Sequence, residues 1–115
     1  MERRRVVITG LGAVTPLGLT VPESWRAVRE GVCGVGPITA YDPAGMKVQL
    51  AAEVKGFDPG ALFGKPEAKR MGRFTQFALA AAREALGNFK PSEEEKSRCG
   101  VSISSGIGGI GITES

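Results

Sequence analysis

Apolar side chains along this chain of 115 residues fall into short β-branched runs and one long helical stripe. Residues 5–9, Arg-Val-Val-Ile-Thr, predict a buried strand that ends at Gly10. Residues 99–104 predict a second buried strand. Between them, residues 22–30 predict a helix with Thr20 or Ser24 as its cap and Gly31 after its last turn.

The clearest predicted element is a helix from about residue 66 to residue 86. Its apolar positions recur every three or four residues, at Met71, Phe74, Ala78, Ala81, Ala82 and Ala85. Because this face is mostly alanine, another element must approach the helix very closely. Gly72 would lie inside this helix, where glycine costs roughly 1 kcal/mol relative to alanine, and Gly87 would end it.

The predicted order is strand, helix, irregular hairpin-like insert, long helix and strand. Residues 48–54 in the insert predict an edge strand. Two buried strands joined by helices favour an α/β fold with a parallel pair and a right-handed crossover. Two strands cannot bury both faces of a sheet, so we expect residues 1–115 to be one segment of a larger domain, truncated at its C-terminal end.

Composition places the chain among ordinary water-soluble proteins. It is 42% hydrophobic and 23% charged, with a formal net charge of +3. No apolar run approaches the roughly 20 residues that span a membrane, and the basic start at residues 1–5 leads into too short an apolar run for a signal peptide. We therefore expect a cytoplasmic protein with no membrane partner. Nucleic acid is not expected either, because no aromatic residues interleave the basic ones.

Catalytic residue types are scarce. The chain has no histidine, which excludes Ser-His-Asp and Cys-His pairs and the HExxH zinc motif. Cys33 and Cys99 lie far apart without CxxC spacing, so we expect two small buried or half-buried thiols. The segment should therefore lack a complete catalytic apparatus, and no metal or cofactor is expected.

A glycine-rich turn follows the second predicted strand. Residues Gly106 to Gly111 fit the G-x-G-x-x-G pattern, in which glycines let a backbone approach a pyrophosphate. A nucleotide-binding α/β domain is therefore one alternative function. The other interpretation is that the glycines only allow close packing at the end of a strand.

Basic residues cluster at the start of the long predicted helix, at Lys65, Lys69, Arg70 and Arg73. Positive charge at a helix N-terminus opposes the helix dipole, at roughly 0.3–1 kcal/mol per charge. Such a cluster would attract an acidic partner or a phosphate. The alternative is a solvated surface without a partner.

Together, these segments resemble the N-terminal part of the β-ketoacyl-ACP synthases, most closely the elongating type called synthase II. The similarity lies in residues 4–18 (RRVVITGLGAVTPLG), in Trp25 with residues 31–39 (GVCGVGPIT), in residues 69–74 (KRMGRF) and in residues 100–109 (GVSISSGIGG). These stretches occur in the family's order and spacing. Gly72 and Ser104 depart from the family pattern, which usually has Asp and Gly at these positions.

The resemblance implies a thiolase-like α/β/α/β/α sandwich, of which only the first part of the N-terminal half is present, in a homodimeric enzyme. Such enzymes join an acyl thioester to malonyl-ACP by decarboxylative Claisen condensation and use no cofactor. The family's nucleophilic cysteine and two histidines belong to positions after Ser115, so we expect this segment to be inactive by itself. Synthase I and polyketide ketosynthases are close alternatives.

The resemblance also assigns roles to four residues of this segment. Ile107 matches a position that helps to wall the acyl-chain pocket near the dimer interface. Lys69 and Arg70, together with Lys65, match a basic patch that receives the acidic acyl carrier protein.

Overall fold

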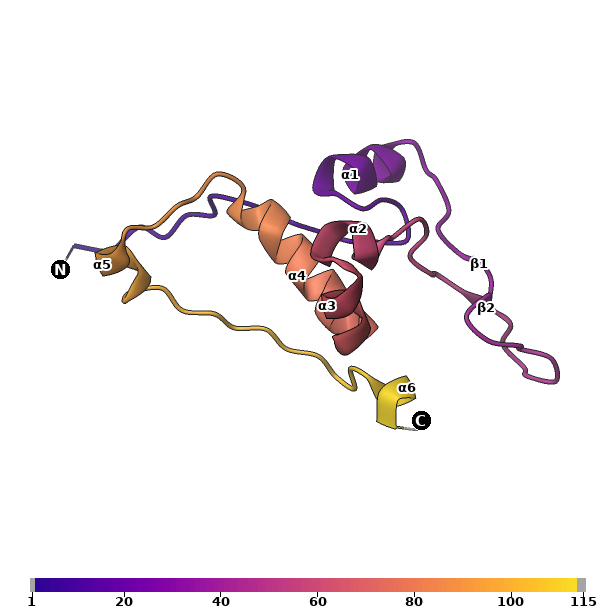
Figure 1. The fold of residues 1–115 in the computed structure, drawn as a ribbon. Helices are drawn as coiled ribbons and strands as arrows, with labels where there is room; N and C mark the ends of the chain where they lie inside the picture. The colour runs from indigo at the N-terminus through magenta and orange to yellow at the C-terminus, as the bar shows by residue number, and fades with distance from the viewer. Residues whose placement is uncertain (1, 114–115) are drawn as a thin grey trace. The chain divides into compact units, whose positions relative to one another are not determined.

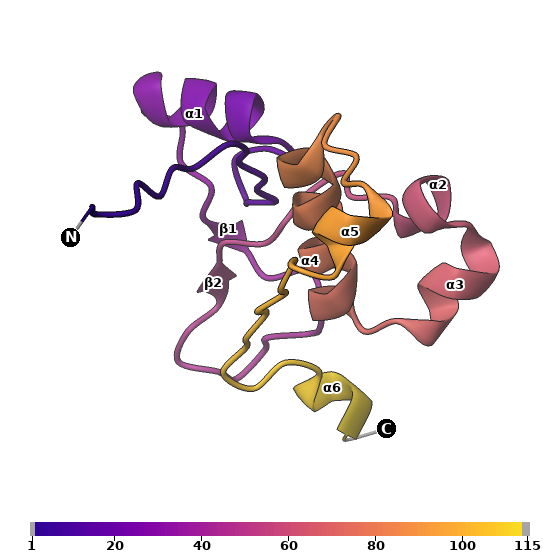
Figure 2. The same ribbon diagram turned by 90° about the vertical axis from the view of Figure 1, so that its left-hand side faces the viewer.

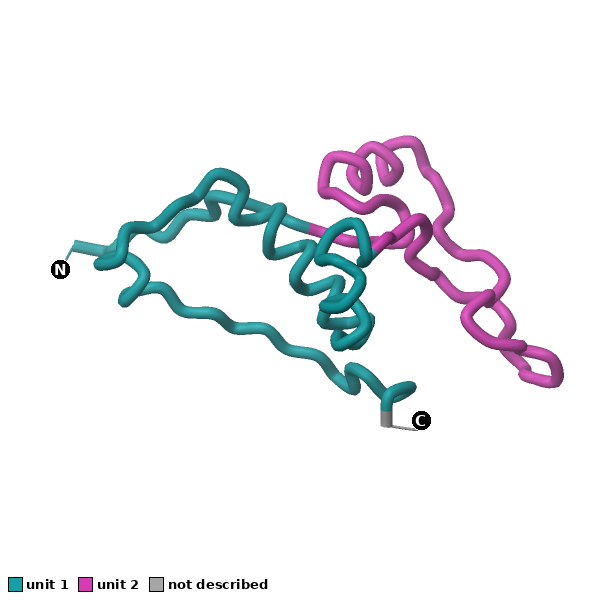
Figure 3. The backbone as a smooth tube through the Cα atoms, viewed as in Figure 1, with its two compact units in different colours: residues 1–12, 59–115 teal, residues 13–58 magenta. Residues whose placement is uncertain are grey.

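The computed structural model describes residues 2–113, which form two compact units. One unit is Ala13–Asp58, and the other combines Met1–Gly12 with Pro59–Ser115 (Figure 3). The first unit contains α1 (Val21–Arg29), β1 (Gly36–Pro37) and β2 (Leu50–Ala51). The second contains α2 (Pro59–Phe63), α3 (Lys65–Arg70), α4 (Arg73–Leu86), α5 (Glu93–Lys96) and α6 (Ile110–Thr113) (Figure 1).

Helix α1 begins and ends within one residue of the predicted bounds, 22–30. The hydroxyl oxygen of Thr20 accepts a hydrogen bond from the Glu23 amide at 3.3 Å, so Thr20 is the N-cap. Pro22 occupies the first turn, where its missing N–H has no helical partner to lose. Gly31 follows the C-cap with a φ of 69°, a conformation that glycine adopts without strain.

The predicted edge strand at residues 48–54 is much shorter in the structure. Only Leu50 and Ala51 form β2, which pairs antiparallel with β1. The Glu53 carboxylate then closes the hairpin, since it accepts hydrogen bonds from the Thr39 hydroxyl at 2.8 Å and from the Ala40 amide at 3.0 Å. The Thr39 hydroxyl, followed by the Ala40 amide, lowers the pKa of Glu53 below its ordinary value of 4.5.

The extended chain at residues 10–12 lies directly against α4. A methyl group on Gly10 would overlap the carbonyl oxygen of Ala85, and one on Gly12 would overlap that of Ala81. The close approach that the alanine face of this helix predicts is therefore confirmed, and its partner is the backbone of the N-terminal segment. Gly87 caps the helix end, with its amide donating to the Arg83 carbonyl at 3.1 Å.

The single helix predicted over residues 66–86 is wrong in one respect, because it is broken between α3 and α4. Met71 ends α3 in an extended conformation, with φ −106° and ψ 134°. Gly72 is the N-cap of α4 and does not lie inside a helix. The expected cost of a mid-helix glycine therefore does not arise.

The two predicted buried strands are not strands in the part of the chain that the structure describes. Residues 5–9 and 99–104 are extended but have no pairing partner, and both views draw the chain between α5 and α6 as a plain extended tube (Figures 1 and 2). Val6 is 93% exposed and Val101 is 88% exposed. A strand needs neighbours for its N–H and C=O groups, and the only sheet among the described residues is β1 with β2. The predicted parallel pair is therefore not formed.

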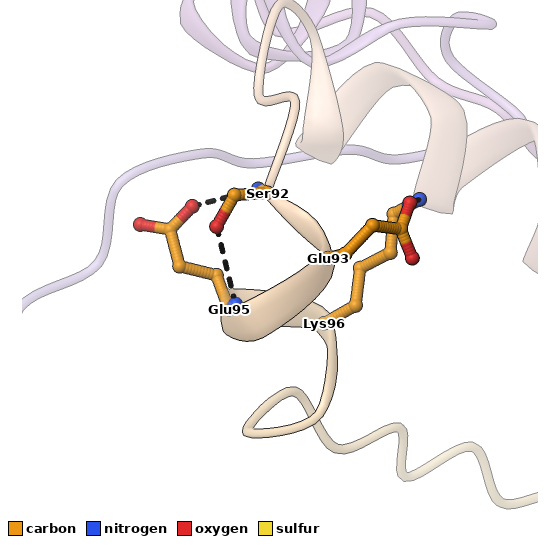
Figure 4. A network of polar contacts seen from close by, with 4 residues as sticks. All are labelled: Ser92, Glu93, Glu95 and Lys96. Atoms are coloured by element: carbon orange, nitrogen blue, oxygen red, sulfur yellow. Dashed lines mark hydrogen bonds and ion pairs between the residues drawn. The ribbon is translucent and has the colours of Figure 1, made fainter.

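A short helix interrupts the charged connection between α4 and the extended segment. Ser92 and Glu95 form a capping box around α5, in which each side chain accepts a hydrogen bond from the other residue's backbone amide (Figure 4). Lys96 and Glu93 form an ion pair at 2.6 Å. Both members are exposed, so this pair adds little to stability. These bonds are local, which explains why four residues suffice for a helix here.

Because Gly12 leaves no space toward α4, we expect Gly12→Ala to lower the free energy of unfolding by roughly 1–3 kcal/mol through overpacking. Urea denaturation followed by circular dichroism measures this change. Gly100→Ala is the matched control, since no atom lies within 4 Å of a methyl group there. Equal unfolding midpoints for the two variants would contradict the close packing of residues 10–12 on α4.

Candidate functional site

The predicted basic residues gather on one short helix. Lys65 opens α3, and Lys69 and Arg70 lie in its last turn; all three side chains are exposed, and we call them the basic patch. The described residues place no carboxylate within ion-pairing distance of them. Lys69 and Arg70 lie at a helix C-terminus, where positive charge is favourable. The expected opposition to a helix dipole is therefore wrong for these two residues.

A buried glutamine fixes the helix that carries the basic patch. Gln76 on α4 is 7% exposed, and its side-chain amide donates to the Ala68 carbonyl at 2.9 Å and to the Met71 carbonyl at 3.3 Å. These carbonyls lie at the end of α3, where helical partners run out. Sequence reasoning missed Gln76, because this residue lies nearly opposite the alanine face of the helix and its sequence position gave no sign of burial.

Arg83 fastens α2 to α4 in a similar way. Its guanidinium donates to the Leu62 carbonyl at 2.6 Å and lies 4.6 Å from the centroid of the Phe63 ring. A cavity of about 250 Å³ opens beside this contact, and Arg70 of the basic patch lines it. Its other lining residues are Phe63, Glu67, Met71, Leu79 and Arg83. The α2–α3 segment therefore has a defined position on α4.

Ile107 lies apart from the basic patch, in the glycine-rich turn before α6. Its side chain is 78% exposed and lines a groove of about 410 Å³. The groove is mainly apolar and is formed by Arg73, Phe74, Phe77 and residues 107–112. Among the basic residues singled out from the sequence, Arg73 joins Ile107 there, whereas Lys65, Lys69 and Arg70 do not.

Neither cysteine occupies a buried site. Both thiols are free and exposed, so the expectation of buried or half-buried cysteines is wrong. Cys99 begins the extended segment that lacks a pairing strand, which leaves its side chain uncovered.

The described residues contain no group of three His, Cys, Asp or Glu residues that would suit a metal ion. Across residues 2–113 no helix combines the length and apolar character that crossing a membrane requires.

Comparison with known proteins gives a consistent result. The family profile described as "Beta-ketoacyl synthase, N-terminal domain" matches residues 3–115. The chain is 41% identical to the 3-oxoacyl-(acyl-carrier-protein) synthase 2 of Synechocystis sp. over 99% of its length, and covers 28% of that relative. It is 45% identical to the Coxiella burnetii protein of the same name over 96% of its length, covering 27% of it. The chain thus spans less than a third of the length of these relatives.

A solved structure is also similar. "The ishigamide ketosynthase/chain length factor" superposes with a TM-score of 0.70 at 38% identity. The match covers 82% of this chain and 23% of that one. The backbone of most of the segment therefore resembles that of a chain in this ketosynthase/chain length factor structure.

Since Gln76 satisfies two carbonyls at the end of α3, we expect Gln76→Leu to lower the free energy of unfolding by about 1–3 kcal/mol. It should also speed amide hydrogen exchange in α3, because that helix loses its tie to α4. Urea denaturation and hydrogen exchange by mass spectrometry measure the two effects. Gln49→Leu removes an exposed bond to the Met46 carbonyl and is the control. Unchanged exchange in α3 would show that Gln76 does not hold this helix.

Proposed function

The chain belongs to the β-ketoacyl synthase family, and we propose that it is the N-terminal segment of a fatty-acid condensing enzyme of the synthase II type. The observation that carries this proposal is 40–45% identity to proteins named 3-oxoacyl-(acyl-carrier-protein) synthase 2 over nearly the whole chain. The family resemblance read from the sequence motifs is thereby confirmed. The similarity to a ketosynthase structure supports the finer proposal of a thiolase-like sandwich.

The proposed reaction joins an acyl thioester to malonyl-ACP. A cysteine thiolate accepts the acyl group, and loss of carbon dioxide from malonyl-ACP generates the enolate that attacks this new thioester. Two histidines would stabilise the developing negative charges on oxygen. Residues 1–115 contain no histidine, so these groups would come from other parts of the full-length enzyme, and we propose that the segment is inactive alone.

The contribution of this segment would be recognition. The basic patch offers exposed, unpaired positive charge on a helix that Gln76 and Arg83 hold in place. We assign it to docking of the acidic acyl carrier protein. Ile107 would form one wall of the acyl-chain pocket near the interface of a homodimer, and its position on an apolar groove supports that role.

The alternative function, nucleotide binding at the Gly106–Gly111 turn, gains no support. The family profile covers the turn. The groove beside the turn is mainly apolar, whereas a pyrophosphate favours polar surroundings.

The reaction itself is testable in two arms. We expect the full-length enzyme to release carbon dioxide and form a β-ketoacyl-ACP from acyl-ACP and malonyl-ACP. Residues 1–115 alone should give no turnover, because neither Cys33 nor Cys99 matches the family's nucleophile and the segment has no histidine. Mass spectrometry of the carrier-protein products measures both. No condensation by the full-length enzyme would overturn the proposed function, and turnover by residues 1–115 would overturn the assignment of catalytic residues.

Docking is tested by charge reversal in the full-length enzyme. Lys69→Glu with Arg70→Glu should weaken carrier-protein binding roughly tenfold, because two attractive charges become repulsive. The effect should grow at low salt, where screening is weak. Surface plasmon resonance over a range of salt concentrations measures it. Lys90→Glu with Arg98→Glu makes the same charge change elsewhere, and equal weakening by both pairs would exclude a specific docking site.

A further inference from the structure

The ring of Phe74, the second residue of α4, is surrounded by three glycines from two distant parts of the chain. A methyl group on Gly108 would lie 2.8 Å from Cδ2 of the ring, and one on Gly109 would lie 2.9 Å from Cε1. A methyl group on Gly72 would also lie 2.9 Å from Cε1. Carbon atoms in favourable contact are about 3.5–4.0 Å apart, so the ring fits only because these positions have no side chains.

This contact ties the glycine-rich turn to α4. The backbone hydrogen bond from Ile112 to the Gly109 carbonyl, at 2.9 Å, is local to the turn. It therefore does not fix the turn relative to the helix. The extended residues 100–106 that lead into the turn have no backbone hydrogen bond to another described segment. The Phe74 ring thus supports the turn from the side of α4, together with Ile112, whose Cδ1 would lie 2.7 Å from a methyl group on Gly72.

Ile107 is the residue directly before Gly108, and both line the same groove as Phe74. Moving the ring would therefore move the wall that Ile107 forms and would change the depth of the groove. The lining is mainly apolar, with Phe77, Ile110 and Ile112 continuing it. An aliphatic chain is the occupant that such a surface favours, because the transfer of its methylene groups out of water is favourable.

We propose that Phe74 is a positioning residue that holds the Ile107 turn and thereby sets the length of acyl chain that the enzyme accepts. The proposal rests on the proposed function, since the acyl chain is the substrate of that reaction. Phe74 acts through Ile107 and the glycine backbone, and takes no part in the chemical steps. The three glycines at positions 72, 108 and 109 are required for the ring to reach the turn.

The test uses the full-length enzyme with carrier-protein thioesters of graded chain length. Phe74→Ala should raise the ratio of kcat/KM for long over short acyl chains by roughly fivefold or more, because the wall that Ile107 forms is no longer held in place by the ring. Phe89→Leu, an exposed aromatic outside the groove, is the control and should leave the ratio unchanged. A change within twofold for an active Phe74→Ala enzyme would overturn the proposal. If Phe74→Ala does not fold, Phe74→Leu replaces it, and the same ratio of kcat/KM for long over short acyl chains is measured.

A double-mutant cycle separates positioning from general destabilisation. Gly108→Ala should lower kcat/KM in the wild-type background, because its methyl group meets the ring and, at 2.8 Å, the Ser105 hydroxyl oxygen. Its effect should be smaller when Phe74 is alanine, since only the Ser105 contact then remains. Additive effects would contradict the contact as the cause. A wild-type enzyme that condenses no acyl chain would instead refute the proposed function, and the two failures are therefore distinguishable.

Discussion

The two hydrogen bonds from Gln76 to the end of α3 hold the helix that carries the basic patch, and so the proposed docking surface depends on them. The buried amide of Gln76 satisfies the carbonyls of Ala68 and Met71 where the helix stops at Met71. The chain can then turn, and α4 restarts from Gly72 in a new direction. A continuous helix over these residues would place Phe74 and the basic patch on one rigid axis. The break separates them, so that Phe74 faces the glycine-rich turn and α3 presents its charges.

Glycine also lets backbone segments of this chain pack closely on α4, because it has no side chain. Gly10 and Gly12 let extended backbone lie on α4, and Gly108 and Gly109 let the second glycine-rich segment lie on Phe74. Each end of α4 is thus in contact with a glycine-containing segment. In the sequence, each of these segments comes directly after an extended apolar run. The large exposed fractions of Val6 and Val101 show that these runs offer an apolar surface still to be covered. In the proposed full-length enzyme, further strands would pair with them.

The division between recognition and chemistry follows from the residue types present. Basic and apolar groups are abundant, whereas histidine is absent. A docking patch needs only exposed charge on a fixed helix, and a pocket wall needs only apolar atoms in a fixed position. Both requirements are met locally, by contacts among α2, α3, α4 and the turn before α6. The proposed chemical step needs a nucleophilic thiolate and oxyanion donors; neither Cys33 nor Cys99 matches the family's nucleophile, and the segment has no histidine, so we assign these groups to other parts of the full-length enzyme.

The sequence by itself determined the elements whose signals are local. A cap at Thr20 or Ser24 and a helix end at Gly87 were predicted, and the structure has Thr20 and Gly87 in these places, because each depends on bonds within a few residues. The family membership followed from motifs in order, and Lys69 and Arg70 were singled out by charge. Tertiary structure alone decided the break at Gly72, the bonds of Gln76 and the exposure of both cysteines. Residues 5–9 and 99–104 have strand sequences, but strand pairing depends on partners distant in the chain, which no local pattern can specify.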